Sequence, residues 1–180
     1  MNHYGGKQMA ESFRTVRKNT IVIAQDIPED KYGFRPTAES KSVGELLVHI
    51  ALTSQFQYQI HGQEHRATLV GYDFMARGKQ LAAEEKILRS KAQTIELLTS
   101  SGEKFAGWLE GLSDAFLAEQ VEMPPGAPIA TKSRFEMILG VKEHEMHHRG
   151  QLMVIERIVG VVPHLTRAQQ ARIAAAAVKS

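Results

Sequence analysis

The chain has 180 residues, of which 43% are hydrophobic and 23% charged, so it suits one compact domain and excludes a second catalytic domain. Its 22 basic and 20 acidic residues are spread along the chain, which argues against a nucleic-acid partner. The absence of cysteine excludes disulfides and thiolate ligands, so a metal site here must use nitrogen and oxygen donors.

The beginning of the chain indicates no membrane segment. Residues 1–7 have no long apolar core behind them, and the apolar patch at residues 21–24 is far too short to span a bilayer. We therefore expect a cytoplasmic protein without a membrane partner.

An amphipathic pattern predicts a first helix between Gly5-Gly6 and Pro28. Apolar residues and one threonine recur there at alternating spacings of four and three: Met9, Phe13, Val16, Thr20, Ile23 and Ile27. Residues 28–37 contain two prolines and a glycine, so they form a connecting loop that Tyr32 and Phe34 anchor to the core.

A capping box at residues 42–45 opens a second helix. One face of this helix carries Leu46, His49, Ile50, Thr53 and Ile60. A lone histidine on such a stripe is more often a hydrogen-bonded core residue than a metal ligand, so His49 needs a partner elsewhere. Glu45, one turn earlier, either orients the His49 imidazole or acts as an ordinary helix cap, and we prefer the cap.

The end of this second helix is polar. His61 and His65 lie there among polar residues, so we expect both to be exposed and neither to bind metal. The following segment, up to Gly78, is expected to be irregular.

A third helix, opening near Ser90, follows from the same alternating pattern, carried by Ile95, Leu98, Gly102, Phe105, Leu109 and Leu112. Gly102 indicates a close contact with a neighbouring helix, and Trp108 is expected to pack in the core. A weak alternation at residues 120–123 allows a short strand, and three prolines within residues 124–128 predict a loop.

The fourth helix is capped by Thr131 or Ser133 and runs to about Val159. Its apolar positions are Phe135, Ile138, Val141, Leu152, Ile155 and Val159. Residues 141–152, Val-Lys-Glu-His-Glu-Met-His-His-Arg-Gly-Gln-Leu, place three of the eight histidines within five residues.

His144 and His148 are one turn apart on this helix and project from the same face, about 6 Å apart along the axis, whereas His147 points elsewhere. His148 lies between Val141 and Ile155 in steps of seven, which predicts a core position. A buried histidine with an ordinary hydrogen bond is the alternative, but the pair on one face favours a metal site.

The run from His144 to His148 also matches the H-E-x-x-H pattern of zinc proteases, in which the glutamate is the general base. Position 151 is Gln where the extended protease pattern has Gly, and no Asp or Glu follows Glu156 to supply a later ligand. The third ligand must therefore lie upstream, where His49 is the candidate. Glu145 lies about 100° round the helix from His144, so it is a poor general base and no catalytic residue is assigned.

Four long amphipathic helices with two extended connections predict an all-α four-helix bundle over residues 1–162. Residues 163–180 form a separate tail, and from Thr166 to Ser180 we expect a short Ala-rich helix that lies on its own or a partner subunit. A basic arm for nucleic acid is the competing interpretation, which three positive charges support weakly.

His49 within Ser-Val-Gly-Glu-Leu-Leu-Val-His-Ile-Ala, followed about 95 residues later by His144-x-x-x-His148-Arg-Gly-Gln, resembles the DinB/YfiT-like family of metalloenzymes, as does the loop at residues 27–36. The resemblance implies a four-helix bundle, commonly dimeric, with a divalent metal on His49, His144 and His148. Nickel or zinc is usual, with iron and manganese as further candidates. Members include thiol-dependent transferases and isomerases and metal-dependent hydrolases.

Two function classes follow. In one, the metal has positions open to water and a small-molecule substrate, and the protein is a hydrolase or a thiol-dependent transferase. In the other, the metal only staples the bundle, in a stress or metal-sensing role. A homodimer is expected in either case, by resemblance and because Gly150 allows a close helix approach.

Overall fold

The computed structural model describes residues 4–177, most of which are helical. The helices are α1 (Gly6–Asp26), α2 (Val43–Gln57), α3 (Phe74–Glu85), α4 (Lys91–Glu110), α5 (Asp114–Ala118), α6 (Arg134–Ile158) and α7 (His164–Ala177). A single 3-10 turn, Glu29–Lys31, follows α1, and a π-helical segment, Tyr58–Gln63, continues α2. Two short antiparallel strands, β1 (Gln120–Glu122) and β2 (Thr131–Ser133), pair Val121 with Lys132.

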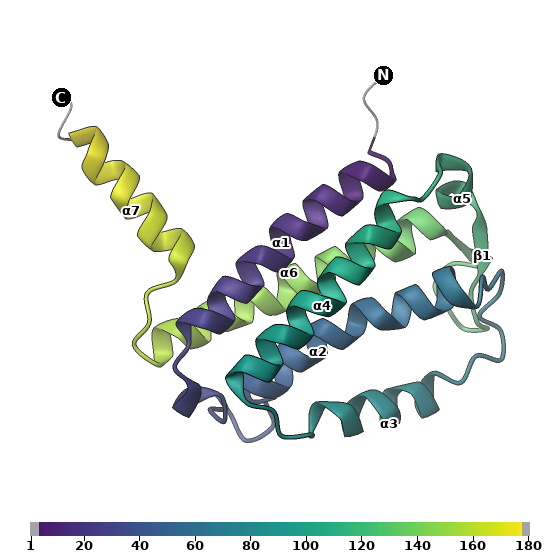
Figure 1. Cartoon of the computed structure of the whole chain (residues 1–180). Coiled ribbons are helices and arrows are strands. Elements are labelled where there is room, and N and C mark those ends of the chain that lie inside the picture. The colour runs from purple at the N-terminus through teal and green to yellow at the C-terminus, as the bar shows by residue number, and fades with distance from the viewer. Residues whose placement is uncertain (1–3, 178–180) are drawn as a thin grey trace.

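Helices α1, α2, α4 and α6 form a four-helix bundle, which confirms the predicted fold class (Figure 1). Each packs against two others, in the order α1, α4, α2, α6 around the bundle. Helices α1 and α6 run in one direction and α2 and α4 in the other, so the C-terminal ends of the first pair meet the N-terminal ends of the second. This arrangement makes α2 and α6 neighbours, although α3, α4 and α5 lie between them in sequence.

The core consists of two main apolar clusters, one towards each end of the bundle. The first joins the end of α1 to the starts of α2 and α4 and the end of α6, around Ile23, Leu47, Leu98 and Leu152. The second joins the opposite ends, around Phe13, Phe105, Leu109 and Ile138. Most residues of the apolar stripes expected from the sequence are therefore buried in the bundle, and Ile95, Leu112, Phe135 and Val159 are half-buried and pack against these clusters.

A buried ion pair lies between the two clusters and connects α1 to α6. The Arg17 guanidinium donates to both carboxylate oxygens of Glu145 from Nε, at 3.0 and 3.1 Å, and Nη1 donates to the Leu98 carbonyl at 2.7 Å. A Cβ on Gly102 would lie 2.8 Å from Cγ of Arg17, so glycine gives the arginine its space. The close contact expected at Gly102 is thus confirmed, with the Arg17 side chain as its partner.

Local sequence signals position the helix ends as expected. Ser42, Ser90 and Ser133 each cap the helix that follows and form a capping box with the residue three positions on. The loop after α1 is anchored by Tyr32, whose hydroxyl donates to the Ala24 carbonyl at 2.7 Å. Trp108 packs on aromatic rings, as predicted, with the Tyr58 ring centroid 5.4 Å away.

Two local expectations were wrong. The segment up to Gly78 contains the start of α3, whose exposed faces carry no apolar stripe and whose single buried residue within residues 74–85 is Glu85. His61 is fully buried, because the π-helical segment turns it inwards, where Arg134 Nη1 lies 3.0 Å from its Nδ1. The short strand allowed at residues 120–123 does form, as β1.

Helix α7 extends away from the bundle beyond its first turns (Figure 1). Its beginning is held by His164 Nε2, 3.2 Å from Asn19 Oδ1, and by Arg167, which donates to Asp26 at 2.7 Å. The tail thus forms the predicted helix, with residues 178–180 outside the described part. Across residues 4–177, no helix combines the length and apolar character that crossing a membrane requires.

Candidate metal centre

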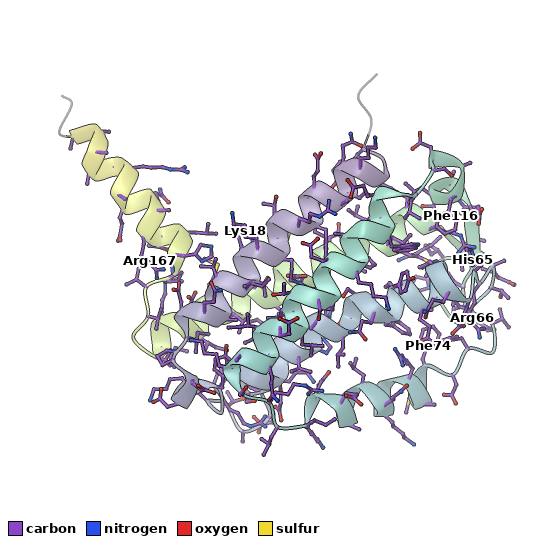
Figure 2. All side chains as sticks on the ribbon, in the orientation of Figure 1. Lys18, His65, Arg66, Phe74, Phe116 and Arg167 are labelled. Atoms are coloured by element: carbon purple, nitrogen blue, oxygen red, sulfur yellow. The ribbon has the colours of Figure 1, made fainter. Side chains whose placement is uncertain are left out.

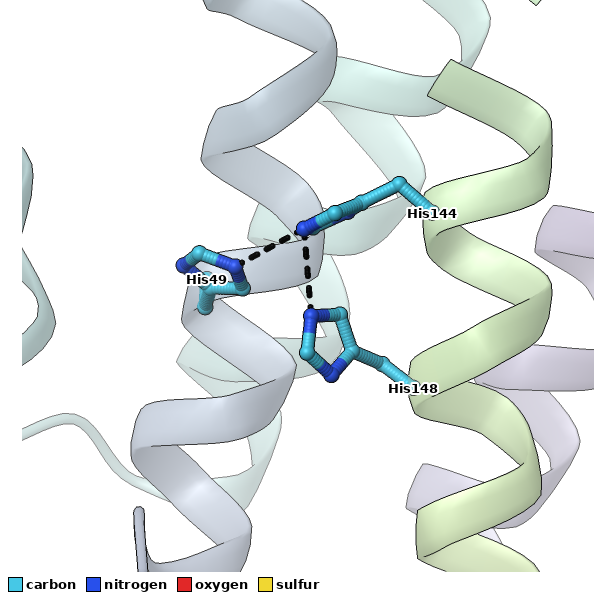
Figure 3. A group of neighbouring side chains, drawn as sticks. All are labelled: His49, His144 and His148. Carbon is cyan, nitrogen blue, oxygen red and sulfur yellow. Dashed lines mark hydrogen bonds between the residues drawn. The ribbon is translucent and has the colours of Figure 1, made fainter. Parts of the chain in front are cut away.

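Helices α2 and α6 bring His49, His144 and His148 together on their shared flank (Figure 3). His144 Nε2 lies 3.1 Å from His49 Nε2 and 3.1 Å from His148 Nε2. All three nitrogens lie within 4.8 Å of one another. His147 points away, as expected, with its Nε2 3.2 Å from the Gln151 amide nitrogen.

The outer nitrogens of two of these rings have fixed partners. His49 Nδ1 lies 2.6 Å from Glu85 Oε1, and His148 Nδ1 lies 2.8 Å from Gln151 Oε1. Both oxygens accept, so each Nδ1 carries a proton, and the neutral form of each ring has its lone pair on the inward-facing Nε2. The two outer hydrogen bonds therefore prepare two donors for one cation.

The position of His144 shows that this group of three histidines suits a metal ion. Its Nε2 faces the lone pairs of both other rings, but a neutral imidazole has one proton to donate and can satisfy only one of them. A cation satisfies all three at once. Nitrogens about 2.0–2.1 Å from one ion lie about 2.8–3.4 Å apart in octahedral or tetrahedral geometry, and the two 3.1 Å separations fall in that range.

The electrostatic setting favours the neutral form of two of these imidazoles, His144 and His148. Burial, followed by the neighbouring His148, His49 and His147 rings, lowers the pKa of His144 to about 4. Burial also lowers the pKa of His148, against the opposing effect of the hydrogen bond that its Nδ1 donates to Gln151 Oε1. Since only a deprotonated ring nitrogen binds metal, both residues are ready to do so at neutral pH.

A cavity of about 460 Å³ opens beside His148. Its lining is Pro36, Ser40, Lys41, Leu46, His148, Gln151, Val154, Ile155 and Ile158. The core position predicted for His148 was therefore wrong: the residue is half-buried, because it lines this cavity as well as packing against the other histidines. His148 connects the histidine group to a space large enough for a small molecule.

Glu145 does not face this site. Its carboxylate is buried in the bundle interior, where it accepts hydrogen bonds from Arg17 and, at 2.7 Å, from Thr20. The glutamate of the H-E-x-x-H pattern is thus a core residue, which excludes the protease interpretation and agrees with the weak base role expected for it.

The family model of the DinB superfamily matches residues 12–152, the stretch that carries all three histidines. The chain belongs to the DinB superfamily. This confirms the resemblance drawn from His49 and from the motif around His144 and His148.

Relatives of this DinB-superfamily chain include the uncharacterized protein YjoA of Bacillus subtilis, 26% identical over 155 residues, which cover 85% of this chain and 90% of YjoA. The crystal structure of YjoA, a DinB-like protein, matches with a TM-score of 0.62, covering 85% of this chain and 92% of that one.

Two further solved structures share the fold. YfiT of Bacillus subtilis, described as a probable metal-dependent hydrolase with an unusual four-helix bundle topology, has a TM-score of 0.68 at 10% identity, with 89% and 91% of the two chains covered. The mycothiol-dependent maleylpyruvate isomerase has a TM-score of 0.63 at 12% identity, covering 84% of this chain and 63% of that one.

The sequence did not predict that Glu85 contacts the histidine triad, through His49. Glu45 caps α2, as preferred from the sequence, and also accepts a hydrogen bond from Arg35. Glu85 takes the orienting position from the end of α3, 36 residues after His49. No periodic pattern marks it, because it is the single buried residue of an otherwise exposed helix.

The remaining histidines near the end of α2 stay away from the triad, as expected. His65 lies at the end of the bundle opposite α7, with its ring centroid 6.1 Å from that of Phe116 (Figure 2). His61 faces Arg134, and burial followed by the Arg134 charge lowers the pKa of His61 to about 4.

Proposed function

We propose that this protein is a metal-dependent enzyme that acts on a small molecule, as a hydrolase or a thiol-dependent transferase. Its metal, nickel or zinc, is held by His49, His144 and His148. The observation that carries the proposal is the 460 Å³ cavity beside His148, because a purely structural metal needs no space for a substrate. The descriptions of YfiT and of the mycothiol-dependent isomerase support the same class of chemistry.

Three neutral imidazoles leave the charge of a divalent ion uncompensated. When bound, the ion supplies a Lewis acid that lowers the pKa of water or of a thiol and polarises a substrate carbonyl. The chain's own residues hold the ligands in place: Glu85 and Gln151 fix the protonated nitrogens of His49 and His148. Val154 and Ile158 give one side of the cavity an apolar surface.

The direct test is a screen of the zinc-loaded and nickel-loaded protein against ester, amide and low-molecular-weight thiol substrates. We expect metal-dependent turnover that His148→Ala reduces at least about 100-fold, because this change removes one ligand of the catalytic ion. His147→Ala, on the same helix but facing away, is the matched control and should retain the wild-type rate. Metal binding without turnover in any class would instead favour the metal-stapled bundle.

A further inference from the structure

The cavity beside His148 has a definite chemical character. Its larger wall is apolar and consists of Leu46, Val154, Ile155 and Ile158, and the one charged side chain in its lining is Lys41. Resting on the proposed metal-dependent function, we propose that this cavity binds a small, largely apolar molecule that carries a carboxylate. Lys41 binds the carboxylate, and Glu85 is the positioning residue that holds the side chains of Lys41 and His49 in place.

Lys41 lines the cavity from the segment just before α2. Its side chain is 40% exposed and forms an ion pair with Glu85, whose side chain is 5% exposed. An ammonium has three donors, and Glu85 takes one of them. The pair therefore places the carboxylate of Glu85 on the buried side and leaves donors of Lys41 for a ligand in the cavity.

Glu85 connects Lys41, which lines the cavity, to His49 of the histidine triad with its two oxygens. Oε1 accepts from His49 Nδ1 and Oε2 accepts from Lys41. One carboxylate therefore sets both the ring orientation of a metal ligand and the position of the cationic anchor. Because Glu85 is the single buried residue of α3, it also fixes the end of that helix against α2.

The charge balance of this group favours an anionic ligand. Lys41 and Glu85 offset one another, so a divalent ion on three neutral imidazoles leaves the site with a net positive charge. A carboxylate gains a charge-assisted hydrogen bond from Lys41, whereas an amine meets repulsion from the same group. The apolar wall supplies the remaining binding energy for a short hydrocarbon portion.

The first experiment measures ligand charge preference by isothermal titration of the zinc-loaded protein. The probes are hexanoate, hexanamide and hexylamine, which have equal chain length and differ in charge. We expect hexanoate to bind about 10–100-fold more tightly than hexanamide, in line with one charge-assisted hydrogen bond, and hexylamine to bind most weakly. Equal affinity for the three probes, or no binding of hexanoate, would overturn the proposal.

Lysine variants locate the anchor. Lys41→Met should bring the hexanoate affinity to within about threefold of hexanamide, because it keeps the length of the side chain and removes its charge. Lys79→Met, on an exposed position of α3, is the control and should keep the full preference. If Lys41→Met also keeps it, the carboxylate is bound elsewhere, for example on the zinc ion, and the anchor role is wrong.

Glu85 is tested by metal affinity, which does not depend on turnover. Glu85→Gln should weaken zinc binding about 10–100-fold, as loss of an orienting carboxylate does, and should shift the visible spectrum of the cobalt-substituted protein. Glu84→Gln, the exposed neighbour, should do neither. Unchanged zinc affinity and spectrum in a folded Glu85→Gln variant would remove the positioning role.

These outcomes separate this inference from the proposed function. A wild-type protein that binds no metal contradicts both. A wild-type protein that binds zinc and turns over a test substrate, but shows no hexanoate preference and no effect of Glu85→Gln, contradicts only the roles given to Lys41 and Glu85.

Discussion

Glu156 on α6 is a buried carboxyl group that makes the stability of this protein depend on pH. It is fully buried, and neither of its oxygens has a hydrogen-bond partner within residues 4–177. Burial, followed by the negative charge of Asp26, raises the pKa of Glu156 to about 7. The folded protein therefore keeps this group protonated at a pH where the unfolded chain has already lost the proton.

The sign of the pH dependence follows from that shift. The contribution of Glu156 to stability is greatest below the ordinary pKa of a glutamate and is lost as the pH rises through about 7. Glu156→Gln should therefore stabilise the protein more at pH 8 than at pH 5, measured by urea denaturation. The exposed Glu143→Gln is the control, and an equal effect of Glu156→Gln at both pH values would refute the prediction.

At the same scale, the sequence predicted which histidines gather but not what holds them. His144 and His148 share a helix face by local geometry alone, and His49 was needed as an upstream partner. Glu85 contacts His49 through a tertiary arrangement, the docking of α3 on α2, which no local pattern encodes. Long-range contacts of this kind become visible only once the helices are placed.

At the scale of elements, the Arg17–Glu145 pair joins α1 to α6. Both side chains are almost completely buried and each is further hydrogen-bonded, so removing one partner leaves an uncompensated buried charge.

Glu145→Leu should therefore lower the free energy of unfolding by about 3–5 kcal/mol, measured by urea denaturation. The double variant Arg17→Met/Glu145→Leu should recover most of this loss, because it buries no unpaired charge. A double variant as unstable as Glu145→Leu would show that the two side chains do not act as a pair.

Elements with a strong local signal were predictable, and elements without one were not. The four bundle helices combine an apolar stripe with a serine cap or a glycine boundary, and all four were predicted close to their observed ends. Helix α3 lacks a stripe because Glu85 is its single buried residue, so its start was taken as irregular. His61 was misplaced because the π-helical segment changes which face of the chain turns inwards.

Helix α7 is the element whose role is best tested by removal. Beyond its first turns it extends away from the bundle, and it exposes Leu165 and Ile173. We propose that the protein is a homodimer in which α7 lies on the partner subunit. Truncation after His164 should then lower the mass measured by light scattering from dimer towards monomer, and an unchanged dimer mass would remove α7 from the interface.

At the scale of the whole molecule, the bundle places two distant parts of the chain at one site. Because α1, α4, α2 and α6 follow one another around the bundle, His49 on α2 meets His144 and His148 on α6 across 95 residues of sequence. The cavity lies on the same flank and is open to a small molecule. The fold, the three histidines and the cavity thus all agree with our central proposal, that His49, His144 and His148 hold one divalent ion.

Metal content per chain, measured by elemental analysis after loading with zinc or nickel and removal of the excess, tests that claim most directly. We expect about one ion per wild-type chain, since three imidazoles from two helices form a single site. We also expect one ion in His147→Ala and almost none in His49→Ala, His144→Ala or His148→Ala, with the helical circular dichroism spectrum retained. Full metal content in a folded His148→Ala variant, or no metal in the wild-type protein, would contradict it.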